Sequence, residues 1–264
     1  MKVMVMAGTS DAVNIINKLV ELTDIEIIAT TTTQHGKDLA IKAGANKVIA
    51  DQMGIEEIED LIHINKINIL IDATHPFAVN ASLNAIRSAK NTGIKYIRFE
   101  RPSIEIPKNK YVLEVSTFQE AAKKAYQTFK QKDNCKIMHF AGVSTLHHII
   151  QWISPKYIIT RVLPVEYSLK KCLEMKIPNK NIIAMQGIFS KNFNKALLEE
   201  YKIGIAVTKE SGKTGGTPTK IEAAIDLEIP IIIVKRPVIN EIKNEITFNN
   251  IENILDYISN MKNI

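Results

Sequence analysis

The chain has little cysteine: Cys135 and Cys172 are the only two among its 264 residues. They form no CxxC motif and have no histidine partner at zinc-ligand spacing, so the sequence carries neither a disulfide framework nor a zinc-finger pattern. The six histidines include no HExxH pair. We therefore expect two reduced thiols and no metal site.

Long apolar runs are also missing. Stretches such as Ile229–Val234 fall far short of the roughly 20 residues that a membrane-spanning helix needs. The apolar run that ends at Gly8 is too short for the hydrophobic region of a signal peptide and lacks a cleavage site. These absences predict a cytoplasmic protein with no membrane partner.

Neither sign of charge dominates, since 34 Lys+Arg and 28 Asp+Glu leave a net charge of +6. Trp152 is the only tryptophan, and the cations are not interleaved with aromatic residues, which argues against nucleic-acid binding. With 45% hydrophobic and 23% charged residues, the composition is that of a globular protein. The length allows one large domain or two of roughly 100–150 residues each.

Short β-branched runs alternate with amphipathic segments along the whole chain, which is typical of α/β folds. In the first half we expect strands at Val3–Met6, Ile25–Thr30, Lys47–Ile49, Ile67–Ile71 and Lys95–Phe99, and helices at Asp11–Leu22, His35–Ala43, Ile55–Asn65 and Asn80–Thr92. The second half has strand patterns at Lys136–Phe140, Tyr157–Thr160, Asn181–Ala184, Gly204–Thr208 and Pro230–Val234. The prediction is two doubly wound, Rossmann-like domains with mainly parallel sheets and a cleft between them. Residues 1–115 would form a cofactor-binding domain and residues 116–264 a substrate-binding domain.

The two halves also resemble each other in how they close. Arg101-Pro102 and Arg236-Pro237 each follow a strand, and after a polar loop each is followed by a further strand and helix pattern. This repetition favours two related halves, although any α/β chain has some self-similarity.

Four segments carry residues suited to ligand chemistry, and the first is the turn from the first strand into the first helix. In a doubly wound sheet this turn binds the pyrophosphate of a dinucleotide through backbone amides and the helix dipole. Gly8, Thr9, Ser10 and Asp11 stand there, but a full GxGxxG is absent. Nucleotide binding and an ordinary N-capped turn are both compatible with this pattern.

The second segment, Thr30 to Thr33, follows the second strand. Enzymes that hold the adenosine ribose of NAD often place an acid here, to bond the 2′-hydroxyl. This chain offers Thr31, Thr32 and Thr33, with Lys37 a turn later. Such a set suits a ribose or a 2′-phosphate, so both NADPH and NADH remain open, as does a plain threonine-rich loop.

The third segment is Asp72-Ala-Thr-His-Pro-Phe-Ala78, at the carboxyl end of the fourth strand, where ligands lie in such sheets. Asp72, Thr74 and His75 place an acid, a hydroxyl and an imidazole on one tight turn. Because the imidazole titrates near neutrality, His75 could orient or protonate a substrate. The simpler alternative is that it only caps the following helix.

The fourth segment runs from Thr208 to Lys220. Its Gly212-Lys213-Thr214 triplet is not a P-loop, because Val207 stands where the first glycine is required. The loop is rich in hydroxyls and carries three lysines, a combination that suits a phosphate or polycarboxylate ligand. A solvated loop without a role is the alternative.

These segments resemble the precorrin-6A reductase family. AGTSDA is similar to its GGTxEA start, DATHPFA matches its DATHPYA/DATHPFA segment, and TKESGKTGGTPTK resembles its TKxSGxxGGxxxK loop. Gly187-Ile188-Phe189 followed by Asn194 is similar to its GPF…N segment. The spacing holds from residue 1 to about 240, and the departures are Ala7, Asp11 and Ile188.

The resemblance implies a reductase of corrin-ring biosynthesis that uses NADPH or NADH to reduce one double bond of precorrin-6A. The Lys/Ile/Asn-rich composition suggests an AT-rich genome, which is common among anaerobes and archaea. Because the ring already carries cobalt in the anaerobic branch, we favour the cobalt-containing ring as the substrate. That ring is a tetrapyrrole fringed with carboxylates, which lysines and arginines would neutralise. We expect a monomer or a homodimer that binds no nucleic acid.

The site assignments that result fall into three groups. The expected catalytic residues are His75, Lys209 and Asp72. The expected cofactor-binding residues are Gly8, Thr9, Ser10, Asp11, Thr31, Thr32, Thr33 and Thr74. The expected substrate-binding residues are His75, Pro76, Phe77, Arg101, Gly187, Lys209, Ser211, Gly212, Lys213, Gly215, Gly216 and Lys220, with Arg236 as a further cation.

Two other functions remain open from the sequence. One is a regulatory module that senses NAD(H) without turnover, which gives no reason for the cationic loop of the second half. The other is a reductase of a different small anionic substrate, for which a ring-sized cleft would be needless.

Overall fold

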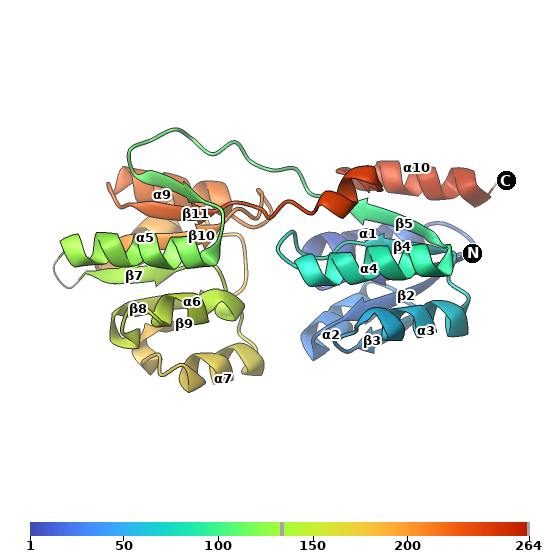
Figure 1. The fold of residues 1–264 in the computed structure, drawn as a ribbon, viewed down its shortest axis with the longest axis horizontal. Helices are drawn as coiled ribbons and strands as arrows, with labels where there is room; N and C mark the ends of the chain where they lie inside the picture. Colours follow the sequence, from blue (N-terminus) through green and yellow to red (C-terminus); the bar gives the residue numbers. More distant parts are fainter. Residues whose placement is uncertain (133–134, 263–264) are drawn as a thin grey trace. The chain divides into compact units, whose positions relative to one another are not determined.

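The computed structural model describes residues 1–132 and 135–262, and the chain folds as two compact units. The first unit comprises Met1–Pro102 and the segment that starts at Val238, and the second comprises Ser103–Pro237. Each is built on a six-stranded sheet in which every strand pair of the described residues is parallel (Figure 1). The predicted α/β class and the two parallel sheets are confirmed, whereas the cleft between the domains stays a prediction.

The sheet of the first unit has the strand order β12-β5-β4-β1-β2-β3. Its strands are β1 (Lys2–Met6), β2 (Glu26–Thr31), β3 (Lys47–Ala50), β4 (Ile69–Asp72), β5 (Lys95–Phe99) and β12 (Ile246–Phe248). Its helices are α1 (Ser10–Val20), α2 (Gln34–Lys42), α3 (Ile55–Asn65), α4 (Val79–Thr92), α10 (Ile251–Lys262) and the short 3-10 helix η4 (Asn240–Asn244).

Alternation along the central strand explains the layers of this unit, because successive side chains of a strand face opposite sides of the sheet. Val3 and Val5 pack in one apolar cluster with α1, α2 and α10. Met4 and Met6 pack in another with α3 and α4. Both faces of the sheet are therefore covered, which accounts for the almost continuous apolar runs of its strands.

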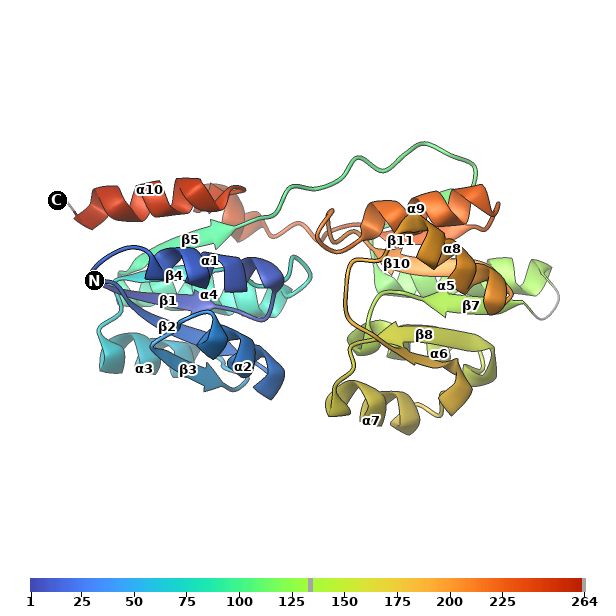
Figure 2. The same cartoon turned by 180° about the vertical axis from the view of Figure 1, so that it is seen from behind.

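The sheet of the second unit has the corresponding order β6-β11-β10-β7-β8-β9. Its strands are β6 (Val112–Val115), β7 (Lys136–His139), β8 (Ile158–Val162), β9 (Ile182–Ala184), β10 (Ile203–Lys209) and β11 (Ile231–Val234). Its helices are α5 (Phe118–Gln131), α6 (Leu146–Ile150), α7 (Glu166–Glu174), α8 (Lys191–Glu200) and α9 (Thr217–Asp226), with 3-10 turns η1 (Val143–Thr145), η2 (Pro155–Tyr157) and η3 (Asn179–Asn181). Helices α8 and α9 cover the face seen in Figure 2, where Met138 and Phe140 pack against them.

The two units exchange their sixth strands. Strand β6 follows β5 along the chain but pairs with β11 of the second unit, while β12 follows β11 and pairs with β5 of the first. Each exchange comes after one of the two Arg-Pro dipeptides, at Pro102 and at Pro237. The strand and helix that were expected after each Arg-Pro are present, but they complete the sheet of the other unit.

The expected boundary at residues 115 and 116 differs from this division. The physical reason is that a parallel edge strand belongs to the sheet that supplies its hydrogen bonds, and residues 112–115 bond to β11. The C-terminal segment likewise returns to the first unit, where Ile254 and Ile258 of α10 are buried against α1. The last two residues of the expected second domain, 263 and 264, lie outside the described residues.

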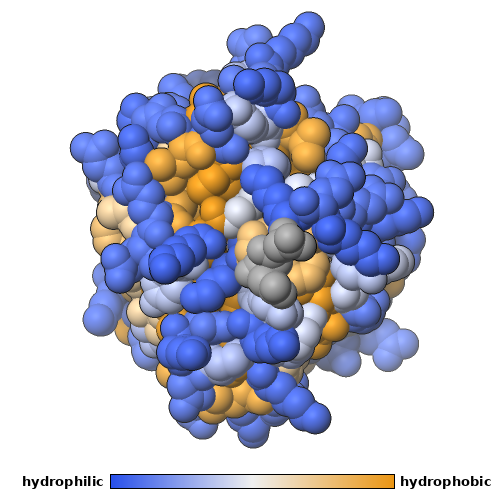
Figure 3. Space-filling view, turned by 90° about the vertical axis from the view of Figure 1, so that its left-hand side faces the viewer, coloured by the Kyte–Doolittle hydropathy of each residue, from blue (hydrophilic) through white to orange (hydrophobic). Residues whose placement is uncertain are grey.

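The surface is mixed, and Figure 3 shows one face on which apolar areas are bordered by hydrophilic side chains. In the described part of the chain, no helix is both long enough and apolar enough to cross a bilayer.

Candidate functional site

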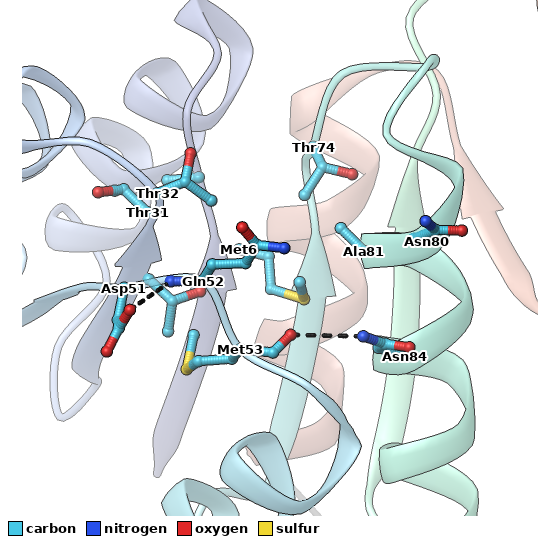
Figure 4. A pocket seen from close by; sticks show the side chains of 12 residues that line it. Met6, Thr31, Thr32, Asp51, Gln52, Met53, Thr74, Asn80, Ala81 and Asn84 are labelled. Carbon is cyan, nitrogen blue, oxygen red and sulfur yellow. Dashed lines mark hydrogen bonds between the residues drawn. The ribbon is translucent and has the colours of Figure 1, made fainter. Parts of the chain in front are cut away.

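The first unit has a pocket at the point where the strand order reverses. Strand β1 lies between β2 and β4, so the connections that leave β1 and β4 diverge above the sheet, which is the ligand site of doubly wound folds. The pocket there has a volume of about 180 Å³ (Figure 4). Its lining residues come from the carboxyl ends of β1 to β4 and from α4: Met6, Ala7, Thr30, Thr31, Thr32, Asp51, Gln52, Met53, Thr74, Asn80, Ala81 and Asn84.

The glycine turn stands beside this pocket and begins α1. Gly8 has a φ of 107°, a backbone conformation that favours glycine, and nothing lies within 4 Å of the position that a Cβ would take. Thr9 caps α1 by accepting a hydrogen bond from the Ala12 amide, and it donates to the carbonyl oxygen of Ala73 at 2.8 Å. The first and third motifs of the sequence are thus joined. The free space above Gly8 is what a phosphate group bound at a helix N-terminus requires.

Asp11 does not project from this turn as a free acid. Its Oδ2 lies 2.5 Å from Nη2 of Arg101, and both side chains are buried. Arg101 was expected to neutralise substrate carboxylates, yet the structure engages it in this ion pair at the start of α1. The pair removes a negative charge that would oppose a phosphate there.

The three threonines after β2 differ in their contacts. Thr31 donates its hydroxyl hydrogen bond to the Thr33 carbonyl oxygen, and Thr33 caps α2 by accepting from the Gly36 amide. Thr32 is exposed and lines the pocket. Asp51, an acid that the sequence analysis did not single out, lies at the end of β3 on the same side of the pocket as Thr31 and Thr32 (Figure 4).

Asp72 is fully buried and bonded on both oxygens. Its Oδ1 lies 2.8 Å from Nη1 of Arg98 and accepts from the Thr74 hydroxyl at 2.6 Å, while its Oδ2 accepts from the Tyr96 hydroxyl at 2.8 Å. Burial opposes ionisation, but the Arg98 charge and the hydrogen bonds outweigh it and hold the pKa of Asp72 below its ordinary value. A buried, ionised carboxylate cannot donate a proton to a substrate. In the structure these contacts hold Thr74 and the turn after β4, and the catalytic role expected of Asp72 stays a prediction.

His75 lies on that turn and is partly exposed. The Phe77 amide donates to its Nδ1 at 3.2 Å, and the two rings are 5.7 Å apart at their centroids. Because Nδ1 accepts this hydrogen bond, the neutral ring carries its hydrogen on Nε2. His75 therefore presents an N–H donor rather than a base, while the neighbouring Pro76 is buried and Phe77 partly buried.

In the second unit, the lysine- and glycine-rich loop folds on itself. The Ser211 amide donates to the Thr217 hydroxyl at 3.0 Å, and the Gly212 amide donates to Oε1 of Glu210 at 2.8 Å. The amides of Ser211 and Gly212, two residues expected to bind the substrate, are thus used inside the loop. A Cβ on Gly215 would lie only 2.2 Å from the Cβ of Ser211, so the loop can close only with glycine there.

The closed loop still places one cation beneath it and one outside. Lys220 is only 6% exposed and donates from Nζ to the Gly215 carbonyl oxygen at 2.9 Å, whereas Lys213 is exposed. Arg236, which was expected as a further cation for the substrate, pairs with Glu210 of the same loop, and its contact with a substrate stays a prediction.

Lys220 has a second cation as its neighbour. The guanidinium of Arg161, on β8, lies between two aromatic rings, 4.4 Å from the centroid of Phe140 and 4.7 Å from that of Phe189. Its Nη1 donates to Oδ1 of Asn194 at 2.9 Å, and Lys220 lies 5.8 Å from the Phe140 ring. Burial lowers the pKa of Lys220 to about 7 and that of Arg161 to about 10, and for Lys220 the charges of Arg161 and Lys209 add to it.

The segments predicted to act together in the second unit are thus brought together. Phe189 and Asn194 hold Arg161, and Asn194 also donates from Nδ2 to the hydroxyl of Thr219, the residue before Lys220. Gly187, with a φ of 149°, opens this segment and is exposed. The Gly187 segment, the lysine-glycine loop and β8 therefore form one cationic site.

His139, at the end of β7, is a structural residue of this site. It is 1% exposed, and its two ring nitrogens lie within hydrogen-bond distance of the hydroxyls of Thr160 and Thr145. Burial, with the charges of Lys209, His148 and His147, lowers its pKa to about 3, so it is neutral near pH 7.

Sequence reasoning missed Arg161 and Arg98. Each interrupts a strand of apolar and β-branched residues, Ile158–Val162 and Lys95–Phe99. A single arginine inside such a run was the available signal, because a charge is buried only where it meets a partner or a ligand.

Comparison with known proteins shows the family to which the chain belongs. Residues 2–259 match the family described as Precorrin-6x reductase CbiJ/CobK. The chain is 45% identical over 258 residues to the cobalt-precorrin-6A reductase of Methanothermobacter thermautotrophicus (98% of this chain, 83% of that protein) and 39% identical over 262 residues to that of Methanocaldococcus jannaschii (99% and 100%). The solved structure "CobK precorrin-6A reductase" shares its fold, with a TM-score of 0.76 at 19% identity, covering 98% of this chain and 97% of that one. The chain is therefore an oxidoreductase that belongs to the precorrin-6x reductase family.

Proposed function

We propose that the protein reduces one carbon–carbon double bond of cobalt-precorrin-6A to give cobalt-precorrin-6B, with NADPH or NADH as the reductant. The relatives in two methanogens carry the name of this activity. The observation that carries the proposal is the pocket at the strand-order reversal of the first unit, beside a glycine turn with free space for a phosphate.

The first unit is proposed to bind the cofactor. The pyrophosphate would lie against Gly8 and the start of α1, where Arg101 neutralises the carboxylate of Asp11. Thr32 and Asp51 would contact the adenosine ribose, from the ends of β2 and β3. A free 2′-hydroxyl is the natural partner of the Asp51 carboxylate, whereas a 2′-phosphate would be bound by Thr32 and the nearby Lys37. The titration described below distinguishes the two.

The second unit is proposed to bind the carboxylate fringe of the tetrapyrrole. Arg161 presents a planar guanidinium that two aromatic rings and Asn194 hold in place, and such a fork suits a carboxylate. Lys220, Lys209 and Lys213 add further positive charge around the loop.

The reaction adds a hydride and a proton across one C=C bond of the ring, and the reduced nicotinamide supplies the hydride when bound. The residues of this chain orient the ring and supply the proton. His75, on the turn after β4, is the first candidate to orient the ring or, in its imidazolium form, to supply the proton, and Lys209 or water is the second candidate for the proton. We place this activity in the cytoplasm, in a monomer or a homodimer.

The proposal is tested by titrating the purified protein with NADPH and NADH separately, following nicotinamide fluorescence, and then adding cobalt-precorrin-6A or the metal-free ring. Oxidation of a bound cofactor only in the presence of the ring supports the reductase and identifies both cofactor and metal state. Binding without turnover on either ring would instead favour a sensing module. No binding of either cofactor would overturn the assignment of the Gly8 turn.

Replacement of His75 by alanine should lower kcat by about 10²-fold, a typical contribution of a positioned donor. The affinity for the cofactor should stay within a few-fold, because the pyrophosphate turn is intact. Steady-state kinetics with the matched variant His63→Ala, an exposed histidine of α3, provide the control. Unchanged turnover in His75→Ala would remove His75 from the mechanism.

A further inference from the structure

Two cations of the second unit lack the acidic partner that the other shielded arginines have. Arg98 pairs with Asp72, Arg101 with Asp11 and Arg236 with Glu210. Over residues 1–132 and 135–262, by contrast, no carboxylate oxygen lies within 4.0 Å of the charged nitrogens of Arg161 or Lys220. The partners that they do have are neutral: an amide oxygen, a backbone carbonyl oxygen and aromatic rings.

The groups packed around Lys220 confirm that its surroundings are positive. Arg161 on β8 and Lys209 on β10 both act on it electrostatically. Two acids on the loop and on α9 have partners of their own, since Glu210 pairs with Arg236, and Asp226 of α9 pairs with Lys191 of α8. The remaining charged groups on or beside α9 are Glu222, Glu105 and Lys213, which line a separate surface pocket, Glu228 just after the helix, and Lys195, Glu199 and Glu200 of α8.

Without a ligand, this arrangement disfavours the positive charge on Lys220. An ammonium group that is 6% exposed loses most of its hydration, and two neighbouring cations repel it. Burial, followed by the charges of Arg161 and Lys209, brings the pKa of Lys220 to about 7. At pH 8 the side chain is therefore mostly a neutral amine, which still donates to the Gly215 carbonyl oxygen.

We propose that a substrate carboxylate enters beside Arg161 together with a proton from solvent, which Lys220 takes up to become the second cation of the site. The neutral amine gains one proton, no covalent bond changes, and the ammonium formed then pairs with the carboxylate. The inference rests on the proposed function only in taking the ligand to be a polycarboxylate. It makes substrate binding depend on pH through a single buried lysine.

The sign of the dependence follows from linkage. The ligand favours the protonated form, so it raises the pKa of Lys220, and affinity falls as the pH rises above the value of about 7 in the free protein. At pH 8 about 0.9 proton should be taken up per carboxylate bound at this subsite. Between pH 8 and pH 9 the dissociation constant should rise by about tenfold.

Isothermal titration calorimetry with uroporphyrin, a stable tetrapyrrole octacarboxylate, measures this uptake. Its carboxylates are already ionised at pH 8, so they release no protons. Titrations in HEPES and in Tris, whose ionisation enthalpies differ, give the number of protons taken up. We expect close to one proton for the native protein and for the control Lys180→Arg, an exposed lysine, and close to zero for Lys220→Arg, whose guanidinium is always charged.

A second measurement uses the native protein, so its result does not depend on whether a variant folds. In protein labelled with ¹³C at the lysine Cε, one lysine should titrate near pH 7 and move above pH 9 when uroporphyrin is added. Uroporphyrin that binds without proton uptake, or that does not bind at all, would overturn the coupling. The proposed function is tested independently of this coupling: it is overturned if cobalt-precorrin-6A produces no oxidation of the cofactor.

Discussion

Replacement of Arg98 by methionine is expected to lower the free energy of unfolding by about 3–5 kcal/mol, the usual cost of leaving a buried charge without its partner. Arg98 is 1% exposed and binds Asp72 and Glu100, each at 2.8 Å, as well as the Thr74 hydroxyl at 3.1 Å. Methionine fills much of the same volume, so the loss reports on the charge rather than on a cavity. Urea unfolding followed by circular dichroism measures it.

The pH dependence of this loss has a defined sign. In the native protein the pKa of Asp72 lies below its ordinary value of 3.8, so the ion pair stabilises the fold above that pH, and the contribution is lost as the pH falls through the folded-state pKa. Without Arg98, burial alone would raise the pKa of Asp72. The destabilisation of Arg98→Met should therefore be smaller at pH 4.5 than at pH 7.

Two further variants separate the ion pair from general effects on β5. Lys95→Met, at an exposed position of the same strand, should change the stability by less than 0.5 kcal/mol, a typical value for a surface substitution. The double variant Arg98→Met with Asp72→Asn should recover part of the loss, because the unpaired charge is gone. A loss below 1 kcal/mol in Arg98→Met would contradict the structural role of the pair.

Replacement of Arg161 by alanine should weaken tetrapyrrole binding by roughly 30- to 1000-fold, equivalent to about 2–4 kcal/mol for removing one partner of a desolvated charge pair. The guanidinium is fixed by Phe140, Phe189 and Asn194 before the ligand arrives, so little entropy is lost on binding. The effect should fall on the KM for the ring. The affinity for NADPH or NADH should not change, because the proposed cofactor residues lie in the first unit.

Fluorescence quenching by uroporphyrin, together with nicotinamide fluorescence, measures both affinities on the same sample. Arg161→Lys keeps the charge but loses the planar fork, so it should recover only part of the affinity. Lys180→Ala, which removes an exposed cation of the same unit, should bind uroporphyrin as the native protein does. Equal losses for Lys180→Ala and Arg161→Ala would mean that net charge alone attracts the ring.

The positions of the strands, and of the four helices α1 to α4, followed closely from the sequence. Strands buried on both faces read as short β-branched runs, and amphipathic segments lie between them, because a parallel sheet requires a helix in each crossover. The placement of the ligand segments was equally predictable. Gly8, His75 and Lys209 stand at or just after the carboxyl ends of β1, β4 and β10, where doubly wound folds bind their ligands.

The partners of the charged side chains could not be predicted in this way. Arg101 and Arg236 looked like cations available to a substrate, but each pairs with an acid that is distant in sequence, Asp11 and Glu210. Asp72 looked catalytic, yet Arg98 and Tyr96, on the neighbouring strand, bond it in the interior. Spacing along a chain does not show which charges are neutralised, because ion pairs form across strands and loops.

The α/β class, the family and the segments proposed to bind ligands could therefore be recognised from the sequence alone, since each depends on local periodicity or on contiguous motifs. The folded structure was needed to show that β6 joins the sheet of the second unit and β12 that of the first, because a strand's partner is set by the hydrogen bonds that it forms in space. The folded structure was also needed to show which neighbouring cations have no carboxylate partner among the described residues. Arg161 and Lys220 are 59 residues apart, and their shared contact with the Phe140 ring exists only in the folded chain.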